Sequence, residues 1–213
     1  DGTLVAAAVE ADGQGWAYPV VRFRSTDPVA IDRQGRLPAV GGKGPMGRFL
    51  FSRVSARSAR TLSLDQPVVL LADTSPSSPH RGRLYAIWEQ AEKEVVDPSV
   101  EYGGYGFNFD IYVSFSDDGT AWSQPVRVND DGTATDQRGP SPALDEDGTL
   151  HVLFFDHRNS PDFPVVDVYY AQSPDGIRFS KNIRVTEQPI PIGAGGRVLG
   201  DYLDMTVTRH DRV

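Results

Sequence analysis

Apolar positions along the chain fall in short runs that end at turns rich in glycine and aspartate. One such pattern occurs twice, at 110–128 and 167–185, with a constant offset of 57 residues. Each copy has a β-branched and aromatic run, a Ser-x-Asp-Gly-x-x-aromatic turn and a second apolar run that ends in Arg-Val. These side chains suit a pleated sheet, and the turn residues suit a tight reversal. Each copy is therefore predicted to be a β-hairpin, and the fixed period indicates a repeated unit.

Two further strands are predicted before each hairpin. A Gly-x-Leu turn followed by an apolar run occurs three times, at 2–8, 82–88 and 148–154. A segment that begins with Asp occurs at 65–71, 136–144 and 201–207. Four short antiparallel strands in each unit are typical of a β-propeller blade. The pattern therefore predicts an all-β chain built from four-stranded antiparallel blades, in a single domain of residues 1–213.

The two hairpin turns resemble a known motif. Its residues are Ser116, Asp118, Gly119 and Trp122 in the first copy and Ser173, Asp175, Gly176 and Phe179 in the second. They resemble the Asp-boxes, or BNR repeats, of sialidase-like β-propellers, with one residue fewer than usual between Asp and the aromatic residue. The resemblance implies that these residues are structural. It also implies a secreted or periplasmic location, for which no signal peptide is recognised in the sequence.

The predicted strands divide the chain into blades at about 1–60, 65–130 and 136–190, with a partial one at 200–213. Closed propellers have about four to eight blades, and the sialidase-like ring has six. We therefore expect an incomplete propeller of about three blades plus one strand. Open sheet edges favour pairing with another chain. The expected partner is thus a protein or a second chain that completes the propeller.

Composition narrows the classes of partner. The chain has 21 Lys and Arg against 29 Asp and Glu, a net charge of -8, which argues against nucleic-acid binding. The sequence has no run of 18 apolar residues, so no membrane span is predicted. Cysteine is absent, and the four histidines have no metal-ligand spacing. The Gly-rich segment 41–47 lies in no strand–helix context. We therefore expect neither a cofactor nor a metal.

The connections between strands indicate where a site would lie. In an antiparallel meander, successive connections alternate between the two ends of the sheet. The Asp-box joins the third and fourth strands, so the loop between the second and third strands lies at the opposite end. In the sialidase-like family that end holds the active site. The corresponding loops are predicted at 9–19, 89–109 and 155–166.

Candidate cleft residues fall in these loops or beside them: Glu101, Tyr102, Arg138, Asp156 and Arg158. Tyr102 lies next to glycines and suits stacking on a sugar or packing on a neighbouring blade. Asp156 and Arg158 suit either an ion pair between blades or a cleft. The acidic turn Asp130-Asp131-Gly132 lacks a spaced ladder of calcium ligands and is interpreted as a turn.

The catalytic marks of sialidases are missing, since the Phe-Arg-Ile-Pro signature has no counterpart. Carboxylates paired for glycoside hydrolysis cannot be located from the sequence. We therefore predict a non-catalytic extracytoplasmic module for protein assembly or glycan binding. The alternative is a glycoside hydrolase of the sialidase type, in which the five candidate residues line the cleft.

Overall fold

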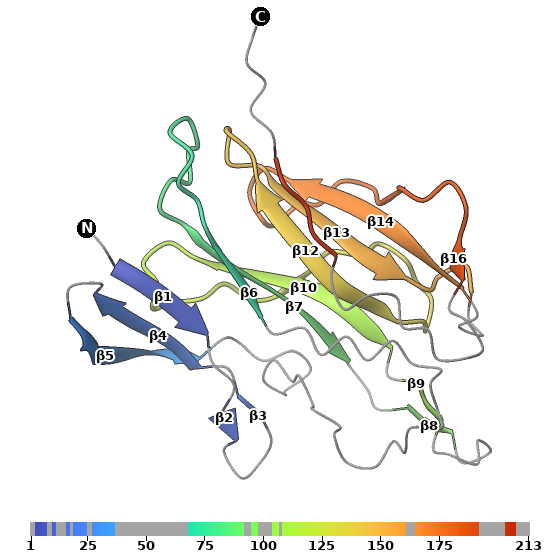
Figure 1. The fold of residues 1–213 in the computed structure, drawn as a ribbon, viewed down its shortest axis with the longest axis horizontal. Helices are drawn as coiled ribbons and strands as arrows, with labels where there is room; N and C mark the ends of the chain where they lie inside the picture. Colours follow the sequence, from blue (N-terminus) through green and yellow to red (C-terminus); the bar gives the residue numbers. More distant parts are fainter. Residues whose placement is uncertain are drawn as a thin grey trace, which may run out of the picture.

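The computed structural model describes part of the chain in full and some strands by their backbone alone. Side chains are described for residues 68–90, 108–160, 165–191 and 203–207. Backbone strands are described in addition at 3–7, 10–11, 16–17, 19–24, 27–36, 91, 95–97 and 104–106. All of these elements are β-strands, and every pairing between them is antiparallel. The prediction of an all-β antiparallel chain is confirmed (Figure 1).

A four-stranded sheet and a five-stranded sheet carry the repeat. The middle sheet has the order β11-β10-β7-β6. Its strands are β6 (Val69–Ala72), β7 (Leu84–Ala91), β10 (Phe109–Ser116) and β11 (Val126–Arg127). The last sheet has the order β12-β13-β14-β15. Its strands are β12 (Gln137–Leu144), β13 (Leu150–Asp156), β14 (Val165–Ser173) and β15 (Ile183–Arg184), and β16 (Ile190–Pro191) also pairs with β14. Each hairpin predicted from the repeat is present, as β10–β11 and β14–β15.

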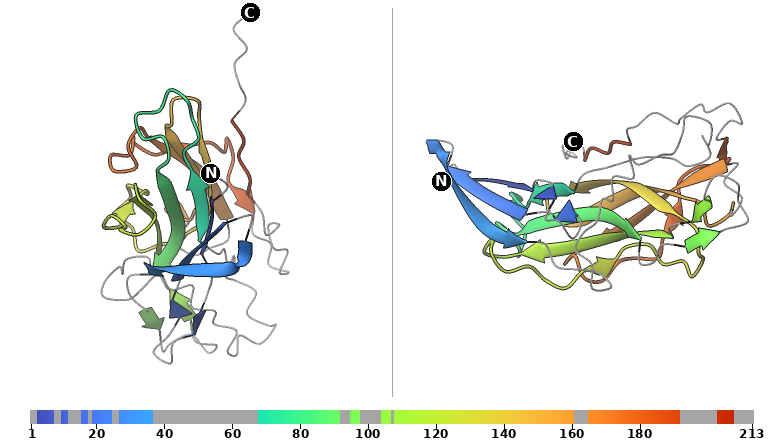
Figure 2. Two further views of the ribbon diagram at one scale, coloured as in Figure 1. Left: turned by 90° about the vertical axis from the view of Figure 1, so that its left-hand side faces the viewer. Right: turned by 90° about the horizontal axis from the view of Figure 1, so that it is seen from below.

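A third sheet lies nearer the amino terminus. This amino-terminal sheet has the order β1-β4-β5, with β1 (Thr3–Ala7), β4 (Pro19–Arg24) and β5 (Asp27–Arg36). Two small hairpins complete the described strands: β2 (Glu10–Ala11) with β3 (Trp16–Ala17), and β8 (Val95–Asp97) with β9 (Gly104–Gly106). Figure 2 shows the three sheets following one another along the molecule.

The middle and last sheets share one hydrophobic core. Tyr85, Ile87, Ile111 and Val113 of the middle sheet pack with Leu150, Val152, Phe154, Tyr169 and Ala171 of the last sheet. Each large apolar side chain that is fully buried in this way contributes roughly 1.5–3 kcal/mol to folding. The joint between the two sheets is therefore a main source of stability in the described part of the chain.

The two sheets stack in the same orientation, not as mirror images. Tyr112 and its counterpart Tyr169 are 57 residues apart, yet Tyr112 lies on the outer side of this joint and Tyr169 lies inside it. We call the side that bears Tyr112 or Tyr169 the rear face of its sheet, and the other side the forward face. The forward face of the middle sheet thus packs on the rear face of the last sheet. Such a head-to-tail arrangement can continue in both directions.

The aromatic residues of the two turns both lie on the rear face of their own sheet. Trp122 packs beside Ala86, Trp88 and Tyr112 on the rear face of the middle sheet. Phe179 packs in the shared core, on the rear face of the last sheet.

Among the residues that the structure describes, none forms a helix long and apolar enough to cross a membrane.

Candidate functional site

The two Ser-x-Asp-Gly turns have the same hydrogen bonds. In the first, Ser116 Oγ accepts from the Gly119 N–H at 2.8 Å, and Asp118 Oδ1 accepts from the N–H groups of Thr120 and Ala121 at 2.8 and 2.9 Å. In the second, Ser173 Oγ accepts from Gly176 at 2.8 Å. Asp175 Oδ1 there accepts from the next two N–H groups, each at 2.9 Å. Each turn thus satisfies its own backbone, as expected for a structural motif.

The aspartates of these turns are held in the ionised form. The N–H groups of Ala121 and Thr120 hold the pKa of Asp118 well below its usual range. Burial opposes ionisation of Asp175, but the N–H groups of Arg178 and Ile177 outweigh it, and its pKa is also lowered. A carboxylate engaged in this way serves poorly as a proton donor near neutral pH.

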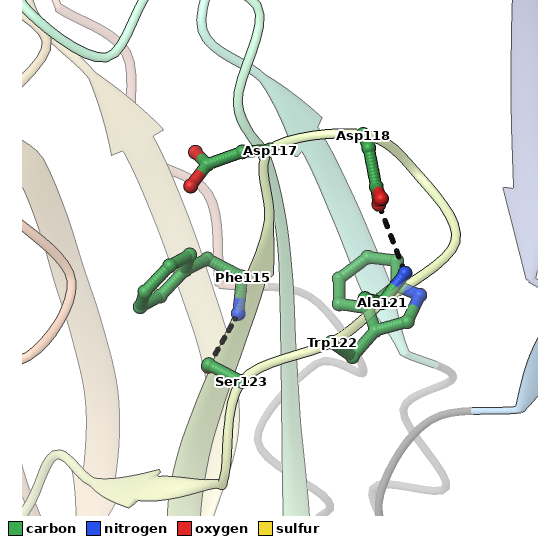
Figure 3. Close-up of a pocket in the computed structure, with 6 residues that line it drawn as sticks. All are labelled: Phe115, Asp117, Asp118, Ala121, Trp122 and Ser123. Atoms are coloured by element: carbon green, nitrogen blue, oxygen red, sulfur yellow. Dashed lines mark hydrogen bonds between the residues drawn. The ribbon is translucent and has the colours of Figure 1, made fainter.

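A shallow hollow of about 400 Å³ lies at the first turn and is lined by Phe115, Asp117, Asp118, Ala121, Trp122 and Ser123 (Figure 3). Asp118 belongs to the turn, and Asp117 accepts from Arg83 Nε at 2.7 Å. The two carboxylates that line the hollow are therefore already bonded within the chain. This hollow is the space beside a hairpin turn and presents no catalytic arrangement.

The second turn packs on the middle sheet. Arg83 Nη1 donates to the Asp175 carbonyl at 3.0 Å, while the same guanidinium binds Asp117 of the first turn. Gly176 has a φ of +73°, and a Cβ on it would lie 2.6 Å from Cε1 of Tyr85. The glycine is thus required both by the turn and by the close approach of the neighbouring sheet.

A polar cluster lies at the other end of the two sheets, where β10 begins and β13 ends. Its main residues are Glu89, Asp110, Asn129, Asp130, Asp131, Asp136, Gln137, Arg138, Asp156, Arg158 and Asn182. Most are buried. Burial of so many charged groups is tolerated only when they are paired and hydrogen-bonded. The pairs within this cluster therefore decide whether it can act as a site.

Arg158 holds the two sheets together within the polar cluster. Its Nε donates to Asp156 Oδ2, its Nη1 to Asp130 Oδ1 and its Nη2 to Asn182 Oδ1, each at 2.8 Å. The guanidinium also lies over the ring of Tyr169, 4.1 Å from the ring centre. Asp130 follows the middle sheet, and the other partners belong to the last sheet. The Arg158 guanidinium thus donates hydrogen bonds to partners from both repeat units.

Asp130 and Asn182 add a reciprocal contact. The Asp130 N–H donates to Asn182 Oδ1 at 2.8 Å, and the Asn182 N–H donates to Asp130 Oδ2 at 3.0 Å. Asn182 Nδ2 also donates to the Val128 carbonyl at 3.1 Å. These bonds join the end of β11 in the middle sheet to the start of β15 in the last sheet.

Arg138 forms a second ion pair across the joint. Its Nε donates to Glu89 Oε1 at 2.9 Å, and the neighbouring Gly139 N–H donates to Glu89 Oε2 at 2.7 Å. The guanidinium lies 4.0 Å from the ring centre of Phe109. Burial raises the pKa of Glu89 to about 7, against the opposing effects of Arg138 and the Gly139 N–H.

Smaller pairs repeat with the 57-residue period. Arg127 binds Asp110 Oδ1 at 3.3 Å, and Arg184 binds Asp167 Oδ1 at 2.7 Å. Their recurrence in both units indicates a structural role. His157 is also buried, with Nδ1 3.1 Å from the Val165 carbonyl, and burial lowers its pKa to about 4.

Three of the five candidate cleft residues come together in the polar cluster. Arg138, Asp156 and Arg158 are all in it, and each is bonded to other residues of the chain. Burial raises the pKa of Asp156, and Arg158 opposes that shift. Glu101 and Tyr102 lie outside the described residues, as does the Gly-rich segment 41–47.

Sequence reasoning misses several members of the polar cluster. The pattern places Glu89 in a loop at 89–109, but β7 extends to Ala91, so Glu89 is a strand residue that faces the joint. Asp130 is interpreted from the sequence as a turn residue, and its bond to Arg158 crosses 28 positions of sequence. The described residues contain no group of three or more His, Cys, Asp or Glu side chains that could hold a metal ion.

Comparison with models of known protein families and with curated proteins found no match for this chain.

Proposed function

We propose that this chain is a non-catalytic β-propeller module that acts in protein assembly. One observation carries the proposal: the arginines of the polar cluster are bound by carboxylates of the chain itself. The Arg138 and Arg158 side chains are only 7% and 13% exposed, and both join the middle sheet to the last sheet. An arginine that recognises a ligand carboxylate would need its paired donors directed to open space.

The stacking of the sheets supports the propeller within this proposal. Two four-stranded meanders pack forward face on rear face, each with an Asp-box turn at the same end. Repetition of that joint generates a ring or an open stack. The resemblance of the turns to sialidase-like repeats favours the ring, and with it a secreted or periplasmic location.

The glycoside hydrolase alternative gains no support from the described residues. Hydrolysis requires two carboxyl groups that face a space large enough for a sugar. Asp156 is 1% exposed and Glu89 is 6% exposed, and each is bonded to an arginine. These two carboxylates therefore form ion pairs that stabilise the joint between the sheets.

The test combines a binding assay with an activity assay. The purified chain is expected to form a stoichiometric complex with a protein and to leave fluorogenic glycosides, sialyl ones included, unchanged. Turnover of any such glycoside that is lost in Asp156→Ala, while the variant remains folded by circular dichroism, would overturn the proposal. So would binding to a glycan array with no protein complex detected by native mass spectrometry.

A further inference from the structure

The forward face of the last sheet has an apolar edge that its counterpart in the middle sheet buries. Ile183 and Val185 are 58% and 54% exposed. Their equivalents 57 residues earlier are Val126 and Val128, and both pack in the core shared with the last sheet, where Val128 is only 2% exposed. Positions that are buried in one unit by the following unit are thus uncovered in the next.

One segment of the chain already packs on the same face. Leu203 packs, with Ile190, against a cluster formed by Phe155, Val166 and Val168. The segment 201–207 has the sequence pattern of the first strand of a unit, and among the described strands residues 203–207 have no pairing partner. Among the described residues, the forward face of the last sheet therefore carries a segment with the sequence pattern of a first strand, but no full sheet.

The amino-terminal sheet lacks a first strand among its described strands. In the middle and last sheets, the strand that follows the Gly-x-Leu turn pairs with a first strand, β7 with β6 and β13 with β12. The strand that follows Gly2-Thr-Leu4 is β1, which forms the edge of its three-stranded sheet and pairs only with β4 among the described strands. The edge of β1 that no described strand pairs with is the place where a first strand would add.

These two features do not meet within one chain. The amino-terminal sheet and the last sheet lie at opposite ends of the molecule, with the middle sheet between them (Figures 1 and 2). A second copy that stacks as the middle and last sheets do would bring the two into contact.

We propose that the forward face of the last sheet is a docking surface for the amino-terminal sheet of a second copy of this chain. Residues 203–207 of the first copy then pair with β1 of the second, and Ile183 and Val185 become buried as Val126 and Val128 are. The inference rests on the proposed assembly function and names the partner.

The face is suited to an interface rather than to a permanent core, because part of it is polar. His151 and Tyr170 occupy the positions of Tyr85 and Val113 in the middle sheet. The His151 Nδ1 and Tyr170 Oη atoms are 2.6 Å apart, and His151 Nε2 is 3.1 Å from Asp145 Oδ2. Interfaces between separately folded chains combine an apolar core with such polar groups.

The test is sedimentation velocity of the full chain over a range of concentrations. The wild-type chain is expected to dimerise, and the double variant Ile183→Asp/Val185→Asp is expected to dimerise at least tenfold more weakly. Ile177→Asp is the control: Ile177 is 49% exposed, but its equivalent Thr120 stays exposed although the next sheet is docked. This control is expected to dimerise as the wild type does, and far-ultraviolet circular dichroism verifies that all variants fold.

Three results would overturn the inference. The wild-type chain could remain a monomer at every concentration, the double variant could dimerise as tightly as the wild type, or Ile177→Asp could weaken the dimer as much as the double variant. A monomeric chain that still forms a stoichiometric complex with a different protein would refute self-docking and leave the assembly function standing. A monomer with no protein partner that hydrolyses a glycoside would refute both.

Discussion

Replacing Gly176 with alanine tests the contact between the second Ser-x-Asp-Gly turn and the middle sheet. Two separate costs are expected. At φ +73° an alanine is in the left-handed region, which costs roughly 1–2 kcal/mol. The added Cβ would also lie 2.6 Å from Cε1 of Tyr85, whose ring is fully buried and cannot swing away freely. Overpacking of this kind costs roughly 1–3 kcal/mol.

Two other glycines separate these costs. Gly82 has a φ of +96° and no atom within 4 Å of the place that a Cβ would take, so Gly82→Ala should carry only the backbone cost of roughly 1–2 kcal/mol. Gly132 has neither a positive φ nor a close neighbour, so Gly132→Ala should be neutral or slightly stabilising. Gly176→Ala should therefore be the most destabilising of the three, by roughly 2–5 kcal/mol in total.

The assay is thermal unfolding followed by circular dichroism, with urea unfolding as a second measure. A loss of 1 kcal/mol lowers Tm by roughly 2–4 °C in a chain of this size. Gly176→Ala should accordingly unfold at least about 4 °C below the wild type. If Gly176→Ala and Gly82→Ala lose the same stability, Tyr85 does not pack against the turn and the described joint is wrong.

Two further predictions concern charge. Arg158→Ala leaves Asp156 buried without its cation and should lose roughly 3–5 kcal/mol of unfolding free energy in urea. Arg178→Ala removes a pair whose arginine is 83% exposed and should lose under about 1 kcal/mol, so equal losses would contradict the structural role of Arg158. The folded pKa of His157, about 4, lies below its ordinary 6.5. Its stabilising contribution is thus complete above pH 6.5, is lost as the pH falls towards 4, and amounts to at most about 3 kcal/mol. Urea unfolding between pH 7.5 and 4.5 should show a shallower pH dependence for His157→Gln, and an unchanged pH dependence would refute this assignment.

The strands and turns could be predicted because they depend on local pattern. The 57-residue repeat identified both hairpins, and their turns form through bonds spanning two or three residues, such as Gly119 to Ser116. Local chemistry was sufficient for these elements because backbone hydrogen bonds and turn conformation are decided within a few residues.

The partners in the polar cluster could not be predicted in the same way. The sequence correctly groups Arg158 with Asp156, two residues away, but the bond from Arg158 to Asp130 depends on how two sheets stack. Glu89 is missed because the pattern ends β7 too early, and its partner Arg138 is 49 residues away. Contacts across a joint depend on the register and orientation of whole sheets, which a single sequence does not specify.

The central claim is that the charged residues of the polar cluster hold the two repeat units together. The most direct test is a double-mutant cycle on Glu89 and Arg138, using Glu89→Ala, Arg138→Ala and the double variant, each unfolded in urea. The account predicts that each single substitution costs roughly 3–5 kcal/mol, because it removes the closest ion-pair partner of the other buried charge. The double variant should then cost at least about 1.5 kcal/mol less than the sum of the two. A coupling energy within about 0.5 kcal/mol of zero would show that the two side chains act independently and would contradict the account.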